Sequence, residues 1–289
     1  MHERKEFIPG VIPPKEQVGP AWWFALQWDR VLVHLGSSSA DVPCLVDITE
    51  LGLTLIGRHY LGQLEDHHCY VVQVAEGTVA PAGMTFAGLR QLYGRVHEDL
   101  FWLAGRAVQI ADWDRTHQFC SRCAARMRTR FTERAKECPR CGLLQFPRVS
   151  PAIIVLVERG HELLLARPQH FSPGLYSVIA GFAEPGETLE EAVLREVREE
   201  VGLAIKEIRY FGSRPWPFPH SLMIAFTAAY ADGEISLNDR EIEDARWFTA
   251  ETLPTIPGKI SIARELIEWF VAKQGVSGKE MPAQDQFRR

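Results

Sequence analysis

Residues 181–203 constrain the fold of this chain most, because their seven glutamates stand at helical spacings rather than in a simple charge run. Thr188, followed three residues later by Glu191, forms a capping box, which marks the start of a helix. Gly202 stands where a helix commonly ends in a left-handed residue. We therefore predict a helix that Thr188 opens and Gly202 closes, entered from a strand and a loop.

Three glutamates of this predicted helix, Glu196, Glu199 and Glu200, are close neighbours on its surface. At about 100° per residue, Glu196 and Glu200 share the apolar side of the helix, and Glu199 lies at its edge. An arbitrary acidic helix would instead expose its glutamates to solvent. Beside apolar surface these carboxylates repel each other and lose solvation, and carboxylate oxygens are good ligands for hard divalent cations. We predict that the three residues bind Mg²⁺ or Mn²⁺.

Length, composition and net charge are those of an ordinary soluble globular chain, long enough for about two domains. The chain has 289 residues, a formal net charge of −5 and a pI near 6.1. These values do not mark a generic nucleic-acid binder or a polybasic membrane anchor. No apolar run reaches the roughly 20 residues of a membrane span, and the N-terminus leads into no signal-peptide core. We expect a cytoplasmic protein with no membrane partner.

Turn residues and changes of hydrophobic period divide the chain into four parts. Residues 1–115 are predicted to form a small β-rich domain with a long connecting helix, and residues 116–147 hold paired cysteine motifs. Residues 148–274 contain the glutamate-rich helix between several strands and a final helix. Residues 275–289 are polar and predicted to be disordered. Strands and helices in this order predict an α+β fold.

The connecting helix is predicted from Thr85 to about Trp113, with Gly94 or Gly105 as the place for a break. Its apolar residues step by four and three alternately, which indicates packing of one face against the β domain rather than a coiled coil. The residues that define this period are Leu89, Tyr93, Val96, Leu100, Leu103, Ala107 and Ile110.

Four cysteines form two C-x2-C pairs that are separated by fourteen residues. Four thiolates at this spacing can close a tetrahedron around Zn²⁺ and leave no position for substrate. Two pairs without a βαβ setting argue against a redox role. We predict a structural zinc ribbon, and its arginine-rich hairpin leaves contact with nucleic acid open. The predicted zinc ligands are Cys120, Cys123, Cys138 and Cys141.

Residues 181–203 read G-x5-E-x7-R-E-U-x-E-E-x-G-U, where U is a bulky aliphatic residue, and this spacing resembles the Nudix hydrolase box. The resemblance implies an α/β/α sandwich with a mixed sheet, and hydrolysis of a pyrophosphate with two or more divalent metal ions. Either Glu199 or Glu200 would also be the general base. By the family pattern, Arg195 orients a catalytic carboxylate.

Other positions of the box have structural roles in this interpretation. Gly181, Gly186 and Gly202 are assigned to turns. Glu187 is assigned either to contact with metal through water or to setting the loop before the helix.

A second motif, S-R-P-W-P-F-P-H-S at residues 213–221, narrows the substrate. Its prolines favour extended geometry and would present Trp216 and Phe218 on a stiff loop. The motif is similar to the S-Q-P-W-P-F-P-x-S signature of the NADH pyrophosphatase branch, which also carries an N-terminal β domain and a four-cysteine ribbon. The resemblance covers roughly residues 20–270. It implies cleavage of NAD(H) to nicotinamide mononucleotide and AMP, removal of NAD caps from RNA, and a homodimer.

The same resemblance assigns substrate-contacting positions. Phe146 and Phe182 would sandwich a nicotinamide or adenine ring, including across a dimer interface. Arg214 and His220 stand where glutamine is usual, and Arg214 would pair with a phosphate and shift the substrate preference. The assigned positions are Glu133, Phe146, Ala180, Phe182, Arg214, Pro215, Trp216, Pro217, Phe218, Pro219, His220, Ser221, Glu241 and Ala263, and Glu241 is also a predicted metal ligand.

Two alternatives remain beside this interpretation. A Nudix enzyme could act mainly on another nucleotide, such as ADP-ribose or a diadenosine polyphosphate, because the box gives the reaction and not the substrate. A non-catalytic nucleotide-binding or RNA-binding module would usually have lost carboxylates of the box, and none is missing here.

Overall fold

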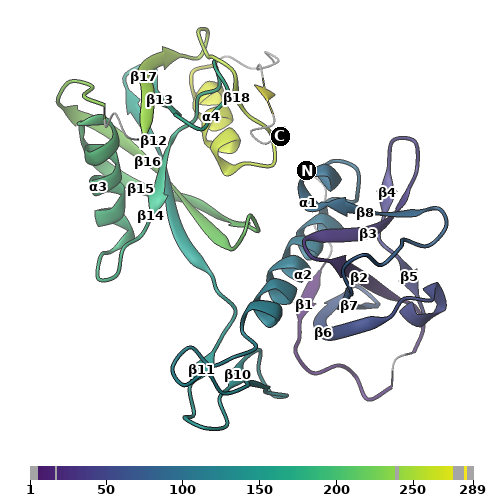
Figure 1. Cartoon of the computed structure of the whole chain (residues 1–289). Coiled ribbons are helices and arrows are strands. Elements are labelled where there is room, and N and C mark those ends of the chain that lie inside the picture. The colour runs from purple at the N-terminus through teal and green to yellow at the C-terminus, as the bar shows by residue number, and fades with distance from the viewer. Residues whose placement is uncertain (1–5, 17, 238–240, 276–282, 285–289) are drawn as a thin grey trace. The chain divides into compact units, whose positions relative to one another are not determined.

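The computed structural model describes residues 6–16, 18–237, 241–275 and 283–284 (Figure 1). The chain divides into two compact units, Met1–Arg148 and Val149–Arg289. Most of residues 275–289, which are predicted to be disordered, lie outside the described residues, so that prediction is not tested. Among the described helices, none is long and apolar enough to cross a membrane.

The first unit is built around a β-sheet with the strand order β1-β6-β7-β2-β3-β4, in which β5 also pairs with β2 and β8 with β3. Trp23, Phe24 and Tyr70 are fully buried in its core. The 3₁₀ helix η1 (Ile48–Leu51) joins two of the strands. The strands are β1 (Phe7–Pro9), β2 (Ala21–Gln27), β3 (Arg30–Leu35), β4 (Ala40–Asp41), β5 (Cys44–Leu45), β6 (Leu55–Leu64), β7 (His67–Val74) and β8 (Met84–Gly88).

The connecting helix of the first unit is shorter than predicted and begins later. Met84–Gly88 forms strand β8, which pairs with β3 in antiparallel register. The helical residues are α1 (Leu89–Leu92) and α2 (Glu98–Thr116), and the break between them contains Gly94 at a φ of 72°. Gly105 lies inside α2. The prediction of one helix from Thr85 is therefore wrong at its start, because pairing with β3 overrides the local period.

The cysteine-rich segment forms a small three-stranded sheet in the order β11-β10-β9. Its strands are β9 (Arg128–Thr129), β10 (Lys136–Glu137) and β11 (Leu144–Gln145). We call residues 116–147 the ribbon. Strands this short bury little apolar surface, so the ribbon depends on its cysteines and on contacts with the rest of the first unit.

The second unit has a mixed sheet in the order β15-β16-β12-β13-β17, and β14 pairs with β12 beside β13. β12 and β16 run parallel, whereas the other neighbours run antiparallel. A separate parallel pair joins β18 to β19. The strands are β12 (Ser150–Arg159), β13 (Glu162–Pro168), β14 (Ile179–Phe182), β15 (Ala204–Trp216), β16 (Ser221–Asp232), β17 (Ile242–Thr249), β18 (Ile256–Pro257) and β19 (Ala283–Gln284).

Two helices cover opposite faces of this sheet, α3 (Leu189–Val201) and α4 (Ile262–Lys273) (Figure 1). Successive residues of a strand point to opposite faces, and β12 shows this directly. Val155 packs in the core beneath α3, and Leu156 packs in the core beneath α4. The predicted α/β/α sandwich with a mixed sheet is confirmed, and the fold is α+β.

Candidate active site

The helix predicted from the glutamate-rich stretch is α3, and both of its ends are confirmed. The Thr188 hydroxyl accepts a hydrogen bond from the Glu191 backbone N–H (3.2 Å), and the Glu191 carboxylate accepts one from the Thr188 backbone N–H (2.7 Å). Gly202 ends the helix at a φ of 73°. Because both ends are fixed, the sequence determines which side chains of α3 face the sheet.

Glu196 is held against the backbone of β14 at a point where no side chain fits. The residue is 8% exposed, and a Cβ atom added to Gly181 would lie 1.9 Å from Glu196 Cδ. Gly181 lies inside β14, so its assignment to a turn is wrong, and its role is to let the carboxyl group approach the backbone. Gly186 and Gly202 do have positive φ angles, as residues of turns.

Glu200 lies one helical turn after Glu196, and it lines a pocket of the second unit. Burial, followed by the charges of Glu196, Glu241 and Glu199, raises the pKa of its carboxyl group to about 8. Burial also raises the pKa of Glu196, against the opposing hydrogen bond from Arg195. Interacting carboxyl groups in a poorly solvated place suit a divalent cation, which would neutralise them. These residues therefore fit the metal that the sequence predicts.

Arg195 ties the loop before α3 to the acidic side of the helix. It donates to both carboxylate oxygens of Glu187 (2.6 and 3.0 Å), to Glu196 Oε1 (2.8 Å) and to Glu199 Oε2 (3.1 Å). It also donates to the Phe182 carbonyl (2.9 Å). The hydrogen bonds from Arg195 lower the pKa of Glu187 to about 2. Glu187 thus sets the loop, whereas the Glu199 side chain is 56% exposed and turned toward Arg195.

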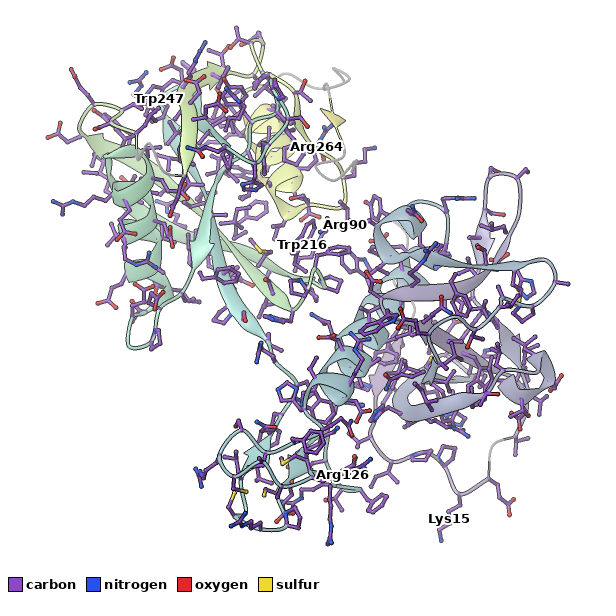
Figure 2. The ribbon with its side chains drawn as sticks, viewed as in Figure 1. Lys15, Arg90, Arg126, Trp216, Trp247 and Arg264 are labelled. Carbon is purple, nitrogen blue, oxygen red and sulfur yellow. The ribbon has the colours of Figure 1, made fainter. Side chains whose placement is uncertain are left out.

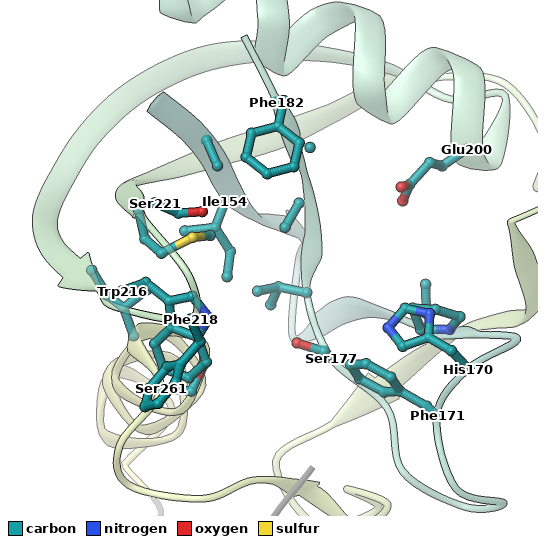
Figure 3. Close-up of a pocket in the computed structure, with 18 of the residues that line it drawn as sticks. Ile154, His170, Phe171, Ser177, Phe182, Glu200, Trp216, Phe218, Ser221 and Ser261 are labelled. Carbon is teal, nitrogen blue, oxygen red and sulfur yellow. The ribbon is translucent and has the colours of Figure 1, made fainter. Parts of the chain in front are cut away.

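The pocket beside Glu200 has a volume of about 360 Å³ (Figure 3). It lies where β13 and β14 both run along β12, and all three strands contribute to its lining. Trp216 and Phe218 lie together on one side, with ring centroids 5.0 Å apart, and Glu200 and His170 lie on the other side (Figure 3). An aromatic wall opposite carboxyl groups that can hold a divalent cation suits a ligand that joins a flat ring to a phosphate, because the cation would lie between the two anionic groups.

The proline-rich motif begins as a strand and continues as a tight turn, rather than forming a loop throughout. β15 continues to Trp216 and β16 starts at Ser221, so the turn comprises residues 217–220. Trp216, Phe218 and Ser221 line the pocket. Pro215, Pro217 and Pro219 are not among its described lining residues, and their assignment to substrate contact stays a prediction.

Arg214 and His220, the two departures from the usual motif, make contacts inside the second unit. Arg214 forms an ion pair with Glu265 of α4. His220 Nδ1 lies 3.1 Å from the Ser150 hydroxyl, and the His220 carbonyl accepts from the Ser150 backbone N–H (2.9 Å). The guanidinium of Arg214 therefore already has an anionic partner, which weakens the case for its pairing with a phosphate.

The other assigned positions differ in how they relate to the pocket. Ala180 and Phe182 line it, whereas Ala263 is buried in the core beneath α4, after the lining residues Ser261 and Ile262. Glu241 is exposed just before β17 and is close enough to raise the pKa of Glu196 and Glu200. Glu133 and Phe146 belong to the first unit, so their contact with substrate, and the pairing of Phe146 with Phe182, stay predictions.

Two residues that line the pocket, His170 and Phe171, follow β13 and belong to no motif that the sequence displays. The Gln169 backbone N–H donates to the Glu241 carbonyl (3.0 Å), which holds this loop beside the start of β17. The rings of His170 and Phe171 meet edge to face at 4.9 Å. The sequence alone does not mark His170 and Phe171 as functional. They are recognised only when the fold places them in the same pocket as Glu200.

The ribbon gathers its four cysteines as the spacing predicts. Their sulfur atoms all lie within 4.8 Å of one another, a cluster suited to one metal ion. At Cys138, backbone N–H groups of Cys141 and Arg140 and hydrogen bonds from Cys123 and Cys141 outweigh burial and lower the thiol pKa to about 6. A thiolate is the form that binds metal. Four protein ligands fit a closed structural zinc site.

Comparison with protein-family models matches three segments. Residues 147–270 match the NUDIX domain, residues 20–113 match the NADH pyrophosphatase-like rudimentary NUDIX domain, and residues 115–146 match the NADH pyrophosphatase zinc ribbon domain. The ribbon match supports structural zinc, and the NUDIX match supports the use of a divalent metal.

Comparison with curated proteins finds several similar relatives, each named NAD-capped RNA hydrolase NudC. The protein from Stutzerimonas stutzeri is 48% identical over 266 residues, which cover 86% of this chain and 96% of the relative. The protein from Pseudomonas aeruginosa is 47% identical over 222 residues, covering 77% and 80%. The protein from Deinococcus radiodurans is 49% identical over 203 residues, covering 69% and 72%.

Proposed function

This chain belongs to the Nudix hydrolase family, in the branch of the NAD-capped RNA hydrolases named NudC, and on that premise we propose what it hydrolyses. The reaction is cleavage of the pyrophosphate bond of NAD(H), which gives nicotinamide mononucleotide and AMP. The same cleavage on NAD-capped RNA removes the cap from the 5′ end. The observation that carries the proposal is the buried carboxyl group of Glu200 in a pocket whose opposite wall is Trp216 and Phe218.

Different residues of the pocket serve the two parts of the substrate, its ring and its charged phosphate groups. Trp216 and Phe218 offer an aromatic wall on which a nicotinamide or adenine ring can stack. Glu196, Glu200 and Glu241 would hold the metal, Mg²⁺ or Mn²⁺, with Glu199 at its edge. When bound, that metal would supply neutralising charge and a water of lowered pKa. Arg195 holds Glu196 in place, which supports a positioning role for this arginine.

The geometry supports Glu200 rather than Glu199 as the general base. Glu200 is buried and lines the pocket, so its carboxyl group faces the space where the substrate would bind. Glu199 is more exposed, and its carboxylate accepts a hydrogen bond from Arg195, which occupies one of its two oxygens. Glu199 then serves as a metal ligand or steadies Arg195.

The experiment measures turnover with Mg²⁺ or Mn²⁺ on NADH, NAD⁺, ADP-ribose and NAD-capped RNA, with identification of the products. We expect AMP and the reduced mononucleotide from NADH. E200Q should lower kcat by at least about a hundredfold, and E190Q, a change of an exposed glutamate on the same helix, should not. Faster turnover of ADP-ribose than of every nicotinamide dinucleotide, or full activity of E200Q, would contradict the proposal.

We also propose that the protein is a homodimer and that it is located in the cytoplasm. Both come from the resemblance and the composition, and sedimentation of the zinc-loaded chain tests the first. A monomer that turns over NADH at the full rate would contradict the dimer as a requirement for activity.

A further inference from the structure

The first unit holds a second cavity, of about 490 Å³, between β6, the end of α2 and the ribbon. Residues 11–13, Tyr70 of β7, and residues 129–131, 133 and 134 complete its lining. We propose that this cavity binds a nucleotide, meaning a nucleobase with its phosphate, either free or within an RNA chain. A cavity of this volume is in the range of small-molecule sites. The site consists of residues of the first unit and needs none of the carboxylates of α3.

Two arginines bring positive charge to the cavity. The guanidinium of Arg58 lies over the rings of Tyr70 and Trp23, 4.3 and 4.9 Å from their centroids. Arg134 donates to two backbone carbonyls of this unit, at 2.7 and 2.9 Å. In the described part of the chain, neither arginine has a carboxylate oxygen within 4.0 Å. An anion in the cavity would therefore meet two guanidinium groups that are not in direct contact with a carboxylate.

Two buried groups of the lining also favour a polar ligand. Burial, and then the charge of Arg106, lower the pKa of Arg134 to about 10, which shows that its charge is poorly solvated. The indole N–H of Trp113 is buried and has no acceptor among the described residues. Buried donors without a partner are rare. A ligand that brings both an anionic group and a hydrogen-bond acceptor would satisfy these two groups.

The two carboxylates that also line the cavity are each in contact with a cation other than Arg58 and Arg134. Glu133 Oε1 lies 3.0 Å from Arg130 Nε. Asp114 Oδ1 lies 2.9 Å from Lys136 Nζ and 3.6 Å from His59 Nε2. Arg58 and Arg134 are therefore the arginines of the lining that have no carboxylate in direct contact among the described residues.

Aromatic surface at the same place selects a nucleobase over a simple anion. Phe131 lines the cavity and is 88% exposed, although exposure of a large apolar ring to water is unfavourable. Tyr60 is half-buried in the same lining. Bases stack on such rings with little regard to sequence, and arginines beside them contact the backbone phosphates. The combination points to a nucleotide rather than to phosphate alone.

The test measures binding to the full-length, zinc-loaded protein without magnesium. The probe is a fluorescent pentaribonucleotide with a 5′ hydroxyl, which carries no pyrophosphate, and unlabelled AMP is the competitor. R58Q and F131A each change an exposed side chain of the cavity. R126Q, at an exposed arginine on the ribbon outside the cavity, is the matched control (Figure 2). Circular dichroism and zinc content verify that each variant is folded.

We expect R58Q and F131A each to weaken binding by about tenfold, and R126Q by less than about twofold. E200Q should bind as the unchanged protein does, because the site does not use α3. Displacement by AMP identifies a free nucleotide as a ligand, whereas binding of the oligonucleotide without displacement identifies an RNA chain. The proposal would be overturned if the unchanged protein did not bind the probe, or if R58Q and F131A bound it as tightly as the unchanged protein. It would also be overturned if R126Q lost as much affinity as those two variants, or if inorganic phosphate displaced the probe as effectively as AMP.

Discussion

At the scale of single residues, the approach of Glu196 to Gly181 decides how accurately the acidic side of α3 is placed. G181A would put a Cβ atom where the Glu196 carboxyl group now lies, 1.9 Å from its Cδ. The carboxyl group is the free end of a side chain, so it can move away and the fold should survive. Displacement of a catalytic group by about 1 Å costs about a hundredfold in rate. We expect that loss in kcat/KM for NADH, with little change in Tm.

The matched control is G212A, because a Cβ atom at Gly212 would meet nothing within 4 Å and this glycine has no positive φ. Both glycines lie in strands of the same sheet. Equal activity of G181A and G212A would show that the position of Glu196 does not limit the reaction.

The raised pKa of Glu200 predicts how stability depends on pH. A carboxyl group with a pKa of about 8 in the folded protein and about 4.5 when unfolded binds its proton more tightly in the folded state. Stability should therefore fall as pH rises from about 4.5 to about 8, and stay level above that. E200Q should lose this part of the dependence. Thermal unfolding of zinc-loaded protein without magnesium, from pH 5 to 9, measures it, and parallel curves for the two proteins would refute the assignment.

The residue patterns of the box could be predicted from the sequence because they are local. Capping by Thr188 and Glu191 involves neighbours in the chain, and so does the end of α3 at Gly202. The role of Gly181 could not be predicted, because its contact with Glu196 joins two elements that only the fold brings together. His170 is a similar case, since its place in the pocket follows from the order of the strands.

At the scale of elements, the ion pair between Arg214 and Glu265 fastens the end of β15 to α4. Trp216 is two residues further along β15, so the pair should help to hold one wall of the pocket. We expect R214A and E265A each to raise KM for NADH by about threefold to tenfold with kcat little changed, since interactions of this kind contribute about 1 kcal/mol. The double variant should resemble either single variant, because the same contact is lost.

Steady-state kinetics of the four proteins form a double-mutant cycle. R209A is a control on the same strand, because Arg209 forms an exposed pair with Glu207. Additive effects of R214A and E265A would show that the two residues act separately, as would be expected if Arg214 contacted the substrate phosphate instead.

The sequence predicts most elements correctly, and its errors occur where pairing between strands decides the outcome. Thr85–Gly88 falls within the helix that the sequence predicts, but these residues pair with β3 and belong to strand β8. Ser213 and Arg214 precede the three prolines of the motif and pair with β16 as part of β15. In both cases the hydrogen-bonding partner lies elsewhere in the sequence, and local propensity gives no information about it.

At the scale of the whole molecule, the sequence identifies the zinc site and the acidic helix more readily than it identifies the cavities around them. The cysteine spacing gives the zinc cluster, because four ligands in two pairs can be read along the chain. The cavity near Arg58 and Arg134 could not be inferred, because its walls come from β6, α2 and the ribbon. A cavity forms where elements that are distant in the sequence pack together, and sequence patterns do not reveal which elements pack together.

The contact between the ribbon and α2 supplies the last prediction. Lys136 of β10 is buried, and its ammonium group lies 2.9 Å from Asp114 Oδ1 of α2. Burial opposes ionisation of Asp114, but hydrogen bonds from His59 and Lys136 outweigh it and hold the pKa of this carboxyl group well below its usual range. D114N would leave the Lys136 charge buried without a counter-ion. Breaking a buried pair in this way costs about 3–5 kcal/mol.

We expect D114N to lower the stability of the first unit by that amount and to leave the second unit unchanged. D112N is the control, because Asp112 lies on the same helix and pairs with Arg115 in a far more exposed position, where such pairs contribute about 1 kcal/mol or less. Hydrogen exchange separates the units, with amides of β6 and β7 reporting on the first and amides of β12 and β16 on the second. Since a lowered carboxyl pKa stabilises the fold above the unfolded pKa, the difference between D114N and the unchanged protein should shrink as pH falls below about 4. Equal exchange in D114N and D112N would show that this buried pair does not hold the ribbon to α2.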